Sequence, residues 1–421
     1  MNRMQRRVVV TGLGTYNPLG NDTETTWAKI TQGQSGIGPI TLFDASDYKT
    51  RFAGEVKEFD PEALFGRKEA RRMSRVTQLA LAAAQQALAD AQLTITEANR
   101  DRIGVIIGSG MGSLEPIVDN VNTLNERGHG RVSPFFVPMM LADTPAATVS
   151  IAHNLRGPNM SIATACATGN NVIGEAAKMI QRGATDVMVA GGAEAAILPV
   201  AMAGFSVMKA LSTRNDAPEK ACRPFDLNRD GFVTSEGTAV LILESLDHAQ
   251  NRGASIYGEI LGYGTSADAY HISMPAADGS GASAAIQSAL DSAGLTPADI
   301  NYINAHGTST HLNDKGETAA IKTVFGEQAY NVPVSSTKSM HGHLLGAVGV
   351  LEAIICLKSM EAGLLPPTIN YETPDPNCDL DYVPNTARPA AINIAMSNGF
   401  GLGGHNATII LAKWQGGGVA E

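Results

Sequence analysis

The feature that most constrains the fold is an internal repeat separated by about half the chain. The segments AAAQQALADAQLT and AAIQSALDSAGLT align without a gap, and Gln85 in the first corresponds to Gln287, 202 positions later. Each copy is followed by an apolar segment that ends in small residues, RIGVIIGSGMGS in the first half and INYINAHGTST in the second. This repeated pattern of helix, loop and strand predicts two related α/β units.

The repeat continues with a glycine-containing helical segment in each half, CATGNNVIGEAAKMIQRG and GHLLGAVGVLEAIICLKSM. Small residues such as Gly174, Gly346, Ala347 and Gly349 are expected to let these two helices approach closely. We therefore expect a pair of central helices.

No low-complexity linker separates the two units, so we expect them to share one core. A helix that ends at Gly253 and a strand after it place the boundary near Ile256. The predicted halves are residues 1–256 and 257–421. With 421 residues, 44% of them hydrophobic, the chain can bury a large core.

Composition restricts the classes of partner. A net charge of −10 opposes general attraction to nucleic acid. The richest apolar run, LLGAVGVL, is too short to span a bilayer. The four cysteines, at positions 166, 222, 356 and 378, form no C-x-x-C pair, which favours a reducing cytoplasmic setting without a zinc framework or disulfide scaffold.

One basic segment, GRKEARRMSR, interrupts this acidic background. Lys68, Arg71, Arg72 and Arg75 are spaced to share one face of a helix. They form a candidate docking patch for an acidic partner, and the alternative is a solvated helix face whose side chains cover apolar surface.

Cys166 is the strongest candidate for a catalytic residue. In NMSIATACATGNN, residues 161–164 read as a short buried strand, and the following residues read as a helix that begins at the cysteine. The first turn of a helix presents free N–H groups and the positive end of the helix dipole, which favour a thiolate. We therefore interpret Cys166 as a nucleophile, and a buried structural cysteine is the alternative.

Histidines in two loops of the second half are its candidate partners. His306 lies in NAHGTST, and His341 and His343 lie in STKSMHGHLLG, in each case after a predicted strand. A neutral imidazole can exchange a proton with a thiol or donate to an oxygen on which negative charge develops.

Two motifs resemble ligand-binding loops, but each lacks a feature that such a loop requires. SNGFGLGGHN is rich in glycine, but a strand-like NATIILAKW follows it, so no helix would receive a dinucleotide phosphate. DLNRDGFVTSEG resembles a calcium loop, but its twelfth residue is Gly237. We expect neither a dinucleotide site nor a calcium site.

Motifs along nearly the whole chain resemble the elongating type II β-ketoacyl-acyl carrier protein synthases of the thiolase superfamily. In order they are VVVTGLG, PLGN, MLADTPAATVSI, TACATG, ALSTRND, RPFDLNRDGFV, NAHGTST, STKSMHGHLLGA and GFGLGGHN. The resemblance implies a thiolase-like duplicated α/β unit arranged as a five-layer αβαβα sandwich. It also implies a decarboxylative Claisen condensation that elongates fatty acids.

The resemblance assigns roles to the candidate residues. It implies that Cys166 is the nucleophile, that His306 and His343 are its catalytic partners, and that Phe400 supplies an oxyanion-hole amide and a gate. It implies no metal or redox cofactor, because 4′-phosphopantetheine arrives on the acyl carrier protein. It further implies a homodimer.

Supporting residues follow from the same motifs. Lys338 and Glu352 match charged residues near the second histidine, Thr308 and Thr310 match pantetheine contacts, and Met111 matches the acyl pocket. The docking patch Lys68, Arg71 and Arg72 matches the carrier-protein docking helix of the family.

The sequence departs from the family at His341, where threonine is usual, and in NGFGLGGHN, where NSFGFGGTN or a close variant is common. His341 is expected either to perturb protonation near His343 or to face solvent. Two alternatives remain: a ketosynthase of a polyketide or nodulation-type pathway, and a non-enzymatic chain-length factor, which the presence of Cys166 disfavours.

Overall fold

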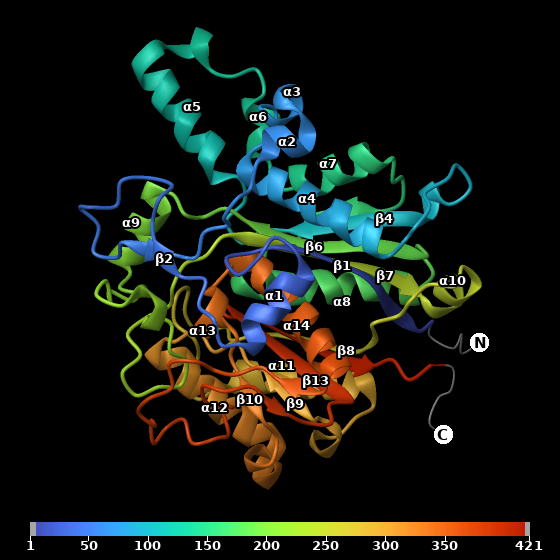
Figure 1. Cartoon of the computed structure of the whole chain (residues 1–421), viewed down its shortest axis with the longest axis vertical. Coiled ribbons are helices and arrows are strands. Elements are labelled where there is room, and N and C mark those ends of the chain that lie inside the picture. The colour runs from blue at the N-terminus through green and yellow to red at the C-terminus, as the bar shows by residue number, and fades with distance from the viewer. Residues whose placement is uncertain (1–5, 417–421) are drawn as a thin grey trace.

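The computed structural model describes residues 6–416 and is built around one mixed sheet of ten strands (Figure 1). Their order is β10-β9-β13-β14-β8-β1-β7-β6-β4-β5. The strands of the first half are β1 (Val8–Tyr16), β4 (Ile103–Gly108), β5 (Asn159–Met160), β6 (Val187–Glu194) and β7 (Gly237–Ser245). Those of the second half are β8 (Gly258–Ala267), β9 (Tyr302–Asn304), β10 (Val334–Ser335), β13 (Ile394–Gly401) and β14 (His405–Lys413).

The two halves of the sheet have the same topology. In the first, β1 pairs antiparallel with β7 and β7 with β6, and then β6, β4 and β5 run parallel. In the second, β8, β14 and β13 pair antiparallel, and β13, β9 and β10 run parallel. The halves meet where β1 pairs with β8 over only two residue pairs, Val9 with Glu259 and Val10 with Gly258. The predicted duplication is confirmed.

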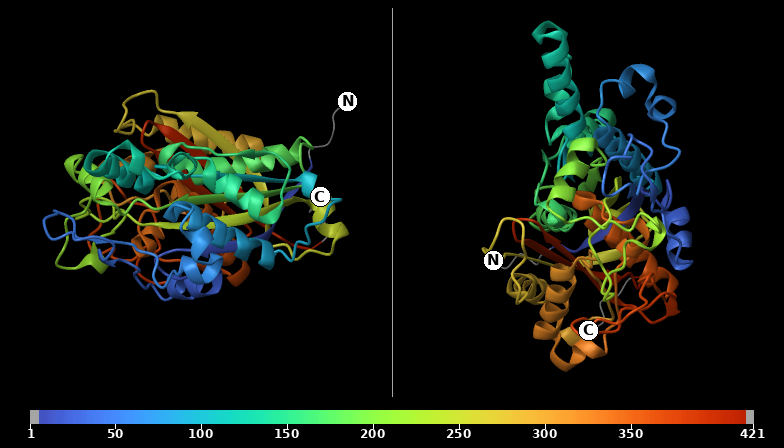
Figure 2. Two further views of the ribbon diagram at one scale, coloured as in Figure 1. Left: turned by 90° about the horizontal axis from the view of Figure 1, so that it is seen from above. Right: turned by 90° about the vertical axis from the view of Figure 1, so that its left-hand side faces the viewer.

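Helices form the other three layers. The first outer layer contains α4 (Arg75–Asp90) and α7 (Thr144–His153), and the second contains α11 (Ser280–Ala293) and α12 (His311–Phe325). Between the two halves of the sheet lie α8 (Thr168–Gln181) and α14 (Val348–Ala362), whose apolar residues join those of both halves in one buried cluster. The layers are therefore α, β, α, β and α, as the resemblance implies (Figures 1 and 2).

Glycines allow the two central helices to touch. A Cβ atom on Gly169 would lie 2.7 Å from the backbone nitrogen of Val350, and one on Gly349 would overlap the Asn170 side chain. Gly174, which the sequence suggested for this contact, instead packs against the ring of Tyr263, where an added Cβ would lie 2.3 Å from ring carbons. This part of the prediction was wrong because the contact with α14 is made by Gly169 and Asn170 of α8, whereas Gly174 lies under Tyr263 of β8.

The strand predicted at residues 161–164 was also wrong. The strand is β5, Asn159–Met160, which lies at the edge of the sheet with both residues exposed. Residues 161–164 lead from it without regular structure to the turn that carries Cys166. The alternating polar and apolar residues of this segment therefore belong to a partly exposed loop and not to a buried strand.

The remaining helices and strands are short or peripheral. The helices are α1 (Thr23–Thr31), α2 (Pro61–Phe65), α3 (Arg67–Ala70), α5 (Leu114–Arg127), α6 (Phe136–Met140), α9 (Pro199–Val207), α10 (Leu246–Asn251) and α13 (Lys338–His341). The strands are β2 (Gly38–Pro39), β3 (Phe52–Ala53), β11 (Leu364–Leu365) and β12 (Arg388–Pro389). Helix α5 projects from the body (Figure 2).

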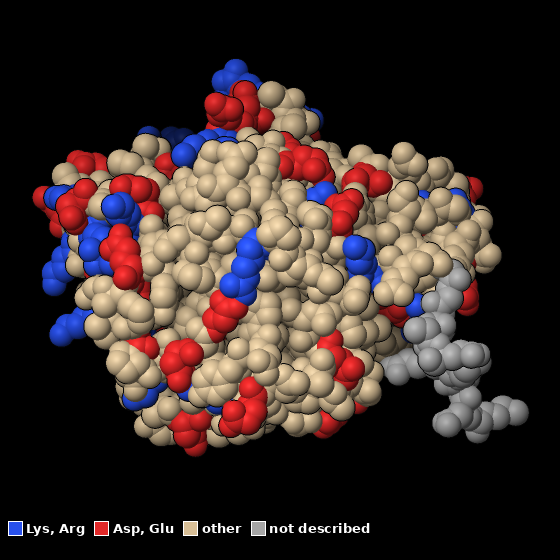
Figure 3. Space-filling model, turned by 60° about the horizontal axis from the view of Figure 1, so that its bottom comes forward, with Lys and Arg blue, Asp and Glu red and all other residues tan. Residues whose placement is uncertain are grey.

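Charged side chains are spread over the face of the molecule that Figure 3 shows. Several Lys and Arg side chains gather at the left edge of this face, beside Asp and Glu, and the middle of the face is mostly uncharged. Within residues 6–416, every helix is too short or too polar to cross a membrane.

Candidate active site

Cys166 lies in a tight turn that enters a central helix. The turn is a 3₁₀ helix, Ala165–Ala167, directly before α8, and Ala165 has a positive φ of 50°, which is uncommon for a residue with a side chain. Thr164 anchors the approach: its N–H donates to Thr168 Oγ1 (2.8 Å), and its Oγ1 accepts from Asn171 Nδ2 (2.6 Å). These bonds fix the sulfur in a turn that an unsupported chain would avoid.

The second half repeats this turn without a nucleophile. Leu345 has a φ of 45° and opens the 3₁₀ turn Leu345–Ala347 before α14, so Gly346 occupies the place that Cys166 has in the first half. The N–H of Gly346 donates to Glu194 (3.0 Å). The duplicated scaffold therefore carries a reactive side chain in one copy only.

Both predicted histidines converge on the sulfur. His343 Nε2 lies 3.0 Å from Cys166 Sγ, and the rings of His306 and His343 are 5.5 Å apart, edge to face. One ligand atom from each of the three residues lies within 4.8 Å of the other two, and all three residues are buried. The first half contributes the thiol and the second half contributes both imidazoles.

The backbone holds each histidine in place. His306 follows β9, and its N–H donates to Glu317 Oε1 (2.8 Å), while the next N–H, of Gly307, donates to Glu317 Oε2 (2.7 Å). His343 follows α13, and its N–H donates to the carbonyl of Val233 (2.8 Å).

Burial controls the protonation of the site and corrects one expectation. Loss of hydration raises the pKa of the Cys166 thiol to about 11, although the charge of Lys338 and nearby backbone N–H groups act in the other direction. Burial, and then Lys338, hold the pKa values of His306 and His343 well below 6.5. The resting site is thus a neutral thiol between neutral imidazoles, and not the thiolate that the helix position suggested.

Lys338 and Glu352 form a fully buried ion pair beside this centre. Lys338 Nζ lies 2.5 Å from Glu352 Oε1, and neither side chain is exposed to solvent. Burial raises the pKa of Glu352 to about 7, against the lowering effect of Lys338. The predicted placement near the second histidine is consistent with the effect of Lys338 on the pKa of His343.

Two buried carboxylates that the sequence analysis missed organise the loops of the site. Glu317 accepts the two N–H groups at His306 and Gly307 and an N–H of Asn398 (3.2 Å). Glu194 closes β6 and accepts from Ser109, Gly110, Met111 and Gly346. The strand VMVAGGAE contained a signal for Glu194, because a single carboxylate ends an otherwise uncharged apolar strand.

The end of β13, with Phe400 and Gly401, and the glycine-rich turn after it lie against the nucleophile turn. The Phe400 ring is 5.7 Å from that of His306, and a backbone N–H of Leu402 lies against the Cys166 thiol and lowers its pKa. A Cβ on Gly401 would lie 2.7 Å from the carbonyl oxygen of Thr164 and 3.0 Å from the Cys166 nitrogen. No side chain fits between this loop and the nucleophile.

We therefore expect Gly401→Ala to displace either the loop or the Cys166 turn and to lower kcat by roughly 10-fold or more. Gly204→Ala is the matched control, because a Cβ added at Gly204 would meet no atom within 4 Å. Steady-state rates and thermal unfolding of both variants check this. Unchanged kcat in Gly401→Ala would show that the close contact has no catalytic effect.

The other predicted residues lie as follows. Thr308 and Thr310 directly follow the His306 loop with their hydroxyl oxygens 3.0 Å apart. Met111 is 36% exposed, with its N–H donated to Glu194. His341 is buried and does not face solvent: its Nδ1 lies 2.7 Å from the Gly342 carbonyl oxygen and its Nε2 lies 3.0 Å from Thr337 Oγ1.

These contacts define the state of His341. A carbonyl oxygen only accepts, so Nδ1 carries the proton and Nε2 accepts from the Thr337 hydroxyl. Burial lowers the pKa of His341 to about 3, so the ring is neutral at physiological pH. His341 therefore adds a neutral hydrogen-bond bridge beside His343. After burial and Lys338, it is the third cause that lowers the pKa of His343, which agrees with the expectation that it perturbs protonation there.

The basic patch is not one helix face. Helix α3 ends at Ala70 and α4 begins at Arg75, whose guanidinium pairs with the buried Glu236 (2.6 Å). Lys68 is exposed, and Arg71 and Arg72 remain 63% and 40% exposed. The patch thus keeps Lys68, Arg71 and Arg72, whereas Arg75 is structural.

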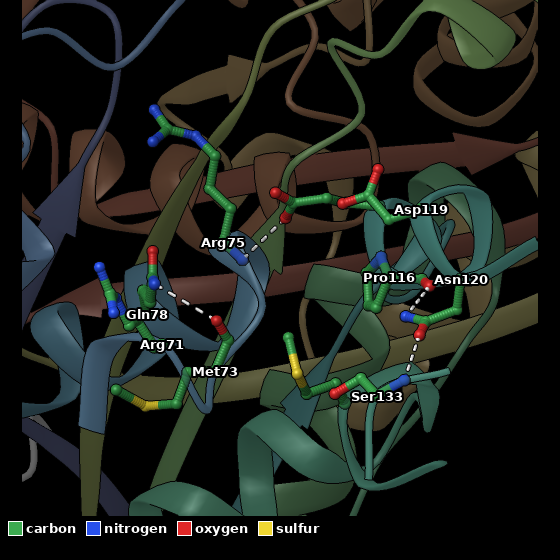
Figure 4. A pocket seen from close by; sticks show the side chains of 10 residues that line it. Arg71, Met73, Arg75, Gln78, Pro116, Asp119, Asn120 and Ser133 are labelled. Atoms are coloured by element: carbon green, nitrogen blue, oxygen red, sulfur yellow. Dashed lines mark hydrogen bonds between the residues drawn. The ribbon is translucent and has the colours of Figure 1, made fainter. Parts of the chain in front are cut away.

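A pocket of about 280 Å³ adjoins this patch (Figure 4). Arg71, Met73 and Gln78 line one side, and Asp119 and Asn120 of α5 line the other. The residues that line the pocket include both acidic and basic side chains but not Cys166, His306 or His343. We therefore treat it as separate from the catalytic centre.

Comparison with known proteins agrees with this geometry. The family model "Beta-ketoacyl synthase, N-terminal domain" matches residues 5–249, and "Beta-ketoacyl synthase, C-terminal domain" matches residues 257–372. The chain is 51% identical over 414 residues to 3-oxoacyl-[acyl-carrier-protein] synthase 2 of Synechocystis sp., covering 98% of this chain and 100% of that relative. It is 53% identical over 410 residues to the enzyme of the same name from Staphylococcus aureus, covering 97% and 99%.

Solved structures show the same fold. A β-ketoacyl synthase from Burkholderia phymatum has a TM-score of 0.90 at 38% identity, covering 97% of this chain and 100% of that chain. A type II polyketide ketosynthase in complex with its acyl-carrier protein has a TM-score of 0.91 at 34% identity, covering 98% and 100%. From the duplicated fold, the Cys-His-His centre and these matches, the chain belongs to the β-ketoacyl synthase family.

Proposed function

We propose that this β-ketoacyl synthase elongates fatty acyl chains by condensing a malonyl group on acyl carrier protein with an acyl group held on Cys166. The observation that carries the proposal is the 3.0 Å contact between Cys166 Sγ and His343 Nε2, with His306 beside it. Fatty acid synthesis is favoured over a polyketide pathway, because the 3-oxoacyl synthase relatives are 51–53% identical and the polyketide ketosynthase is 34% identical. The enzyme class is acyltransferase.

The first half-reaction transfers the acyl group to the sulfur. As Sγ attacks the acyl carbonyl carbon, the thiol proton passes to His343 Nε2 and from there to the departing pantetheine sulfur. The C–S bond to the carrier breaks as the C–S bond to Cys166 forms. Backbone N–H groups of Cys166 and Phe400 would stabilise the oxyanion, as the family motif suggests, and the Leu402 N–H is a third donor near the sulfur.

The second half-reaction uses both histidines as donors. Once Cys166 is acylated, His343 Nε2 no longer receives a proton from the thiol, and each neutral ring can donate to the malonyl thioester oxygen in the tautomer that carries its proton on Nε2. For His343 this is the tautomer opposite to the one that accepts the thiol proton, so its ring proton moves from Nδ1 to Nε2 between the two half-reactions. Loss of carbon dioxide leaves an enolate, whose carbon attacks the acyl-Cys166 carbonyl and releases the cysteine sulfur as a thiolate, which regains its proton from solvent. The thioesters supply the activation, so the reaction as written requires no metal or redox cofactor, and 4′-phosphopantetheine arrives on the carrier.

Intact-mass measurement tests this function directly. The purified enzyme is mixed with acyl carrier proteins that carry chains of several lengths, and we expect one acyl mass to remain on the enzyme and to map to Cys166. Addition of malonyl carrier protein should then remove that mass and release a product two carbons longer. An acyl mass that maps to another residue, or that persists with malonyl carrier protein, would contradict the proposal.

The docking patch is proposed to bind the acidic carrier protein. Lys68, Arg71 and Arg72 place three cations on an exposed surface of an otherwise acidic chain, although Arg72 also pairs with Glu69 (3.1 Å) and stacks over Phe135. We expect Lys68→Glu with Arg72→Glu to raise KM for carrier-bound acyl groups by roughly 10-fold and to leave acylation by a small thioester unchanged.

A charge-reversal at a distant exposed lysine, Lys413→Glu, gives the same change in charge per site and should have no effect on KM. The effect of the double variant should also shrink as salt rises, because the attraction is between exposed charges. Equal losses with carrier-bound and small thioesters would show that the patch supports the fold and does not dock the carrier.

A homodimer is proposed from exposed apolar groups around one edge of the sheet. Ile151 on α7 is 80% exposed, and β5 ends the sheet with unpaired backbone groups. Ile117, Val121 and Leu124 lie along one side of the projecting α5 and are each at least 36% exposed. Such a surface is typical of a face that another protein chain covers. Met111 belongs to the same region and would tune the accepted chain length there.

A further inference from the structure

The three groups around the nucleophile also form a metal-binding set. In a tetrahedral zinc site the bonds are about 2.3 Å to sulfur and about 2.0–2.1 Å to nitrogen, so ligand atoms lie about 3.3–3.6 Å apart. Here the ligand atoms of Cys166, His306 and His343 lie within 4.8 Å of one another, with Sγ and His343 Nε2 at 3.0 Å. We propose that the unacylated enzyme binds a borderline-soft divalent cation such as Zn²⁺ at these residues, and that the ion reversibly inhibits it.

The free ring nitrogens support this assignment. The Nδ1 atoms of His306 and His343 are buried without a hydrogen-bond partner among the described residues. No hydrogen bond at Nδ1 therefore prevents either imidazole ring from a small rotation that moves its edge by about 1 Å. His341 differs, because both of its ring nitrogens are already bonded to Gly342 and Thr337. The site therefore has three protein ligands, Cys166, His306 and His343, and a fourth position open to water or substrate.

The surrounding charges set the strength of binding. A divalent ion with one thiolate keeps a net positive charge, and the buried Lys338 opposes it, although Glu352 balances that lysine at 2.5 Å. Within residues 6–416, the ligating rings also have no acceptor of the kind that usually orients zinc-binding histidines. Binding should thus be weaker than in structural zinc sites, and a chelator should remove the ion.

Acylation of Cys166 should prevent the ion from binding. Metal binding forms a metal–sulfur bond and releases the Cys166 proton to solvent, whereas an acyl thioester on the same sulfur has no proton to release and no free thiolate. The acyl-enzyme should therefore resist zinc. This protection rests on the proposed role of Cys166, but the binding itself does not.

Calorimetric titration with ZnCl₂ tests the site on the full chain. The unmodified enzyme and His129→Ala, which removes an exposed histidine elsewhere, should each bind at this site, and Cys166→Ser should lose it. Titration with Co²⁺ should give a sulfur-to-metal absorption band in the first two proteins and none in the third. Enzyme alkylated at Cys166 serves as a second folded control and should also lose both signals.

Activity should fall with added Zn²⁺ and return when EDTA is added. Zinc binding that is unchanged in Cys166→Ser would overturn the proposal, because the ion would then lie elsewhere. If binding depends on Cys166 but acyl carrier protein loaded with an acyl chain gives no protection, the metal site stands and the proposed nucleophile role fails. The two hypotheses are therefore separable.

Discussion

Cys166→Ser should reduce condensation by roughly 1000-fold or more and should leave no acyl mass on the enzyme. Both histidines lie close to this sulfur, and a serine hydroxyl in the same place is a far weaker nucleophile at neutral pH. The replacement is nearly isosteric, so the fold should persist. Intact-mass measurement and a condensation assay with malonyl carrier protein check both results.

Cys356→Ala supplies the matched control for the loss of a buried thiol. Cys356 lies within the buried cluster of α14, away from any turn that approaches the histidines, and should cost only packing. Its variant should keep the acyl adduct and most of the rate. Chain elongation that survives in Cys166→Ser would remove the basis of the proposed mechanism.

Lys338→Met should have the largest effect on stability. The change leaves Glu352 without its cation in a place where neither side chain meets solvent, and removal of one partner of a buried pair costs about 3–5 kcal/mol in the free energy of unfolding. Replacing both residues, as in Lys338→Met with Glu352→Leu, should cost less than that single change. Urea unfolding of the two variants gives the comparison.

Lys358→Met is the control, because its ammonium group pairs with Glu24 and Glu361, whose carboxylates are 77% and 55% exposed. Water can hydrate those carboxylates, so the loss should be under about 1 kcal/mol. Similar losses for the two lysine variants would show that the Lys338 pair is not a special feature of the core.

The same Lys338→Met variant should change the dependence of activity on pH. Burial and then Lys338 lower the pKa values of His306 and His343, so removal of the cation raises both toward 6.5. A larger share of each ring would then be protonated at a given acidic pH, so the acid limb of kcat/KM should move to higher pH.

The fold class and the three residues of the Cys-His-His centre could be predicted from the sequence, because the internal repeat, the order of helices and strands, and the loops at strand ends are visible as local patterns. The sequence placed Cys166, His306 and His343 in turns that the structure brings together. The prediction was wrong where a protonation state depends on burial. The helix position suggested a thiolate at Cys166, yet the loss of hydration raises the pKa of that thiol to about 11.

Long-range contacts explain the other errors. Arg75 has the spacing of the basic patch, but Glu236, 161 positions later in the chain, makes it part of the interior. Gly174 has the spacing of a helix contact, but Tyr263 lies over it. Glu317 supports the His306 loop through backbone N–H groups, which carry no signature in a single sequence.

The short pairing between β1 and β8 has a practical consequence. The two halves repeat one sheet topology, yet one half supplies the sulfur and the other supplies both rings. Neither piece, expressed alone after a cut near residue 256, could perform chemistry, however well it folded. Mixing the two inert fragments would make the return of activity a direct readout of their reassembly.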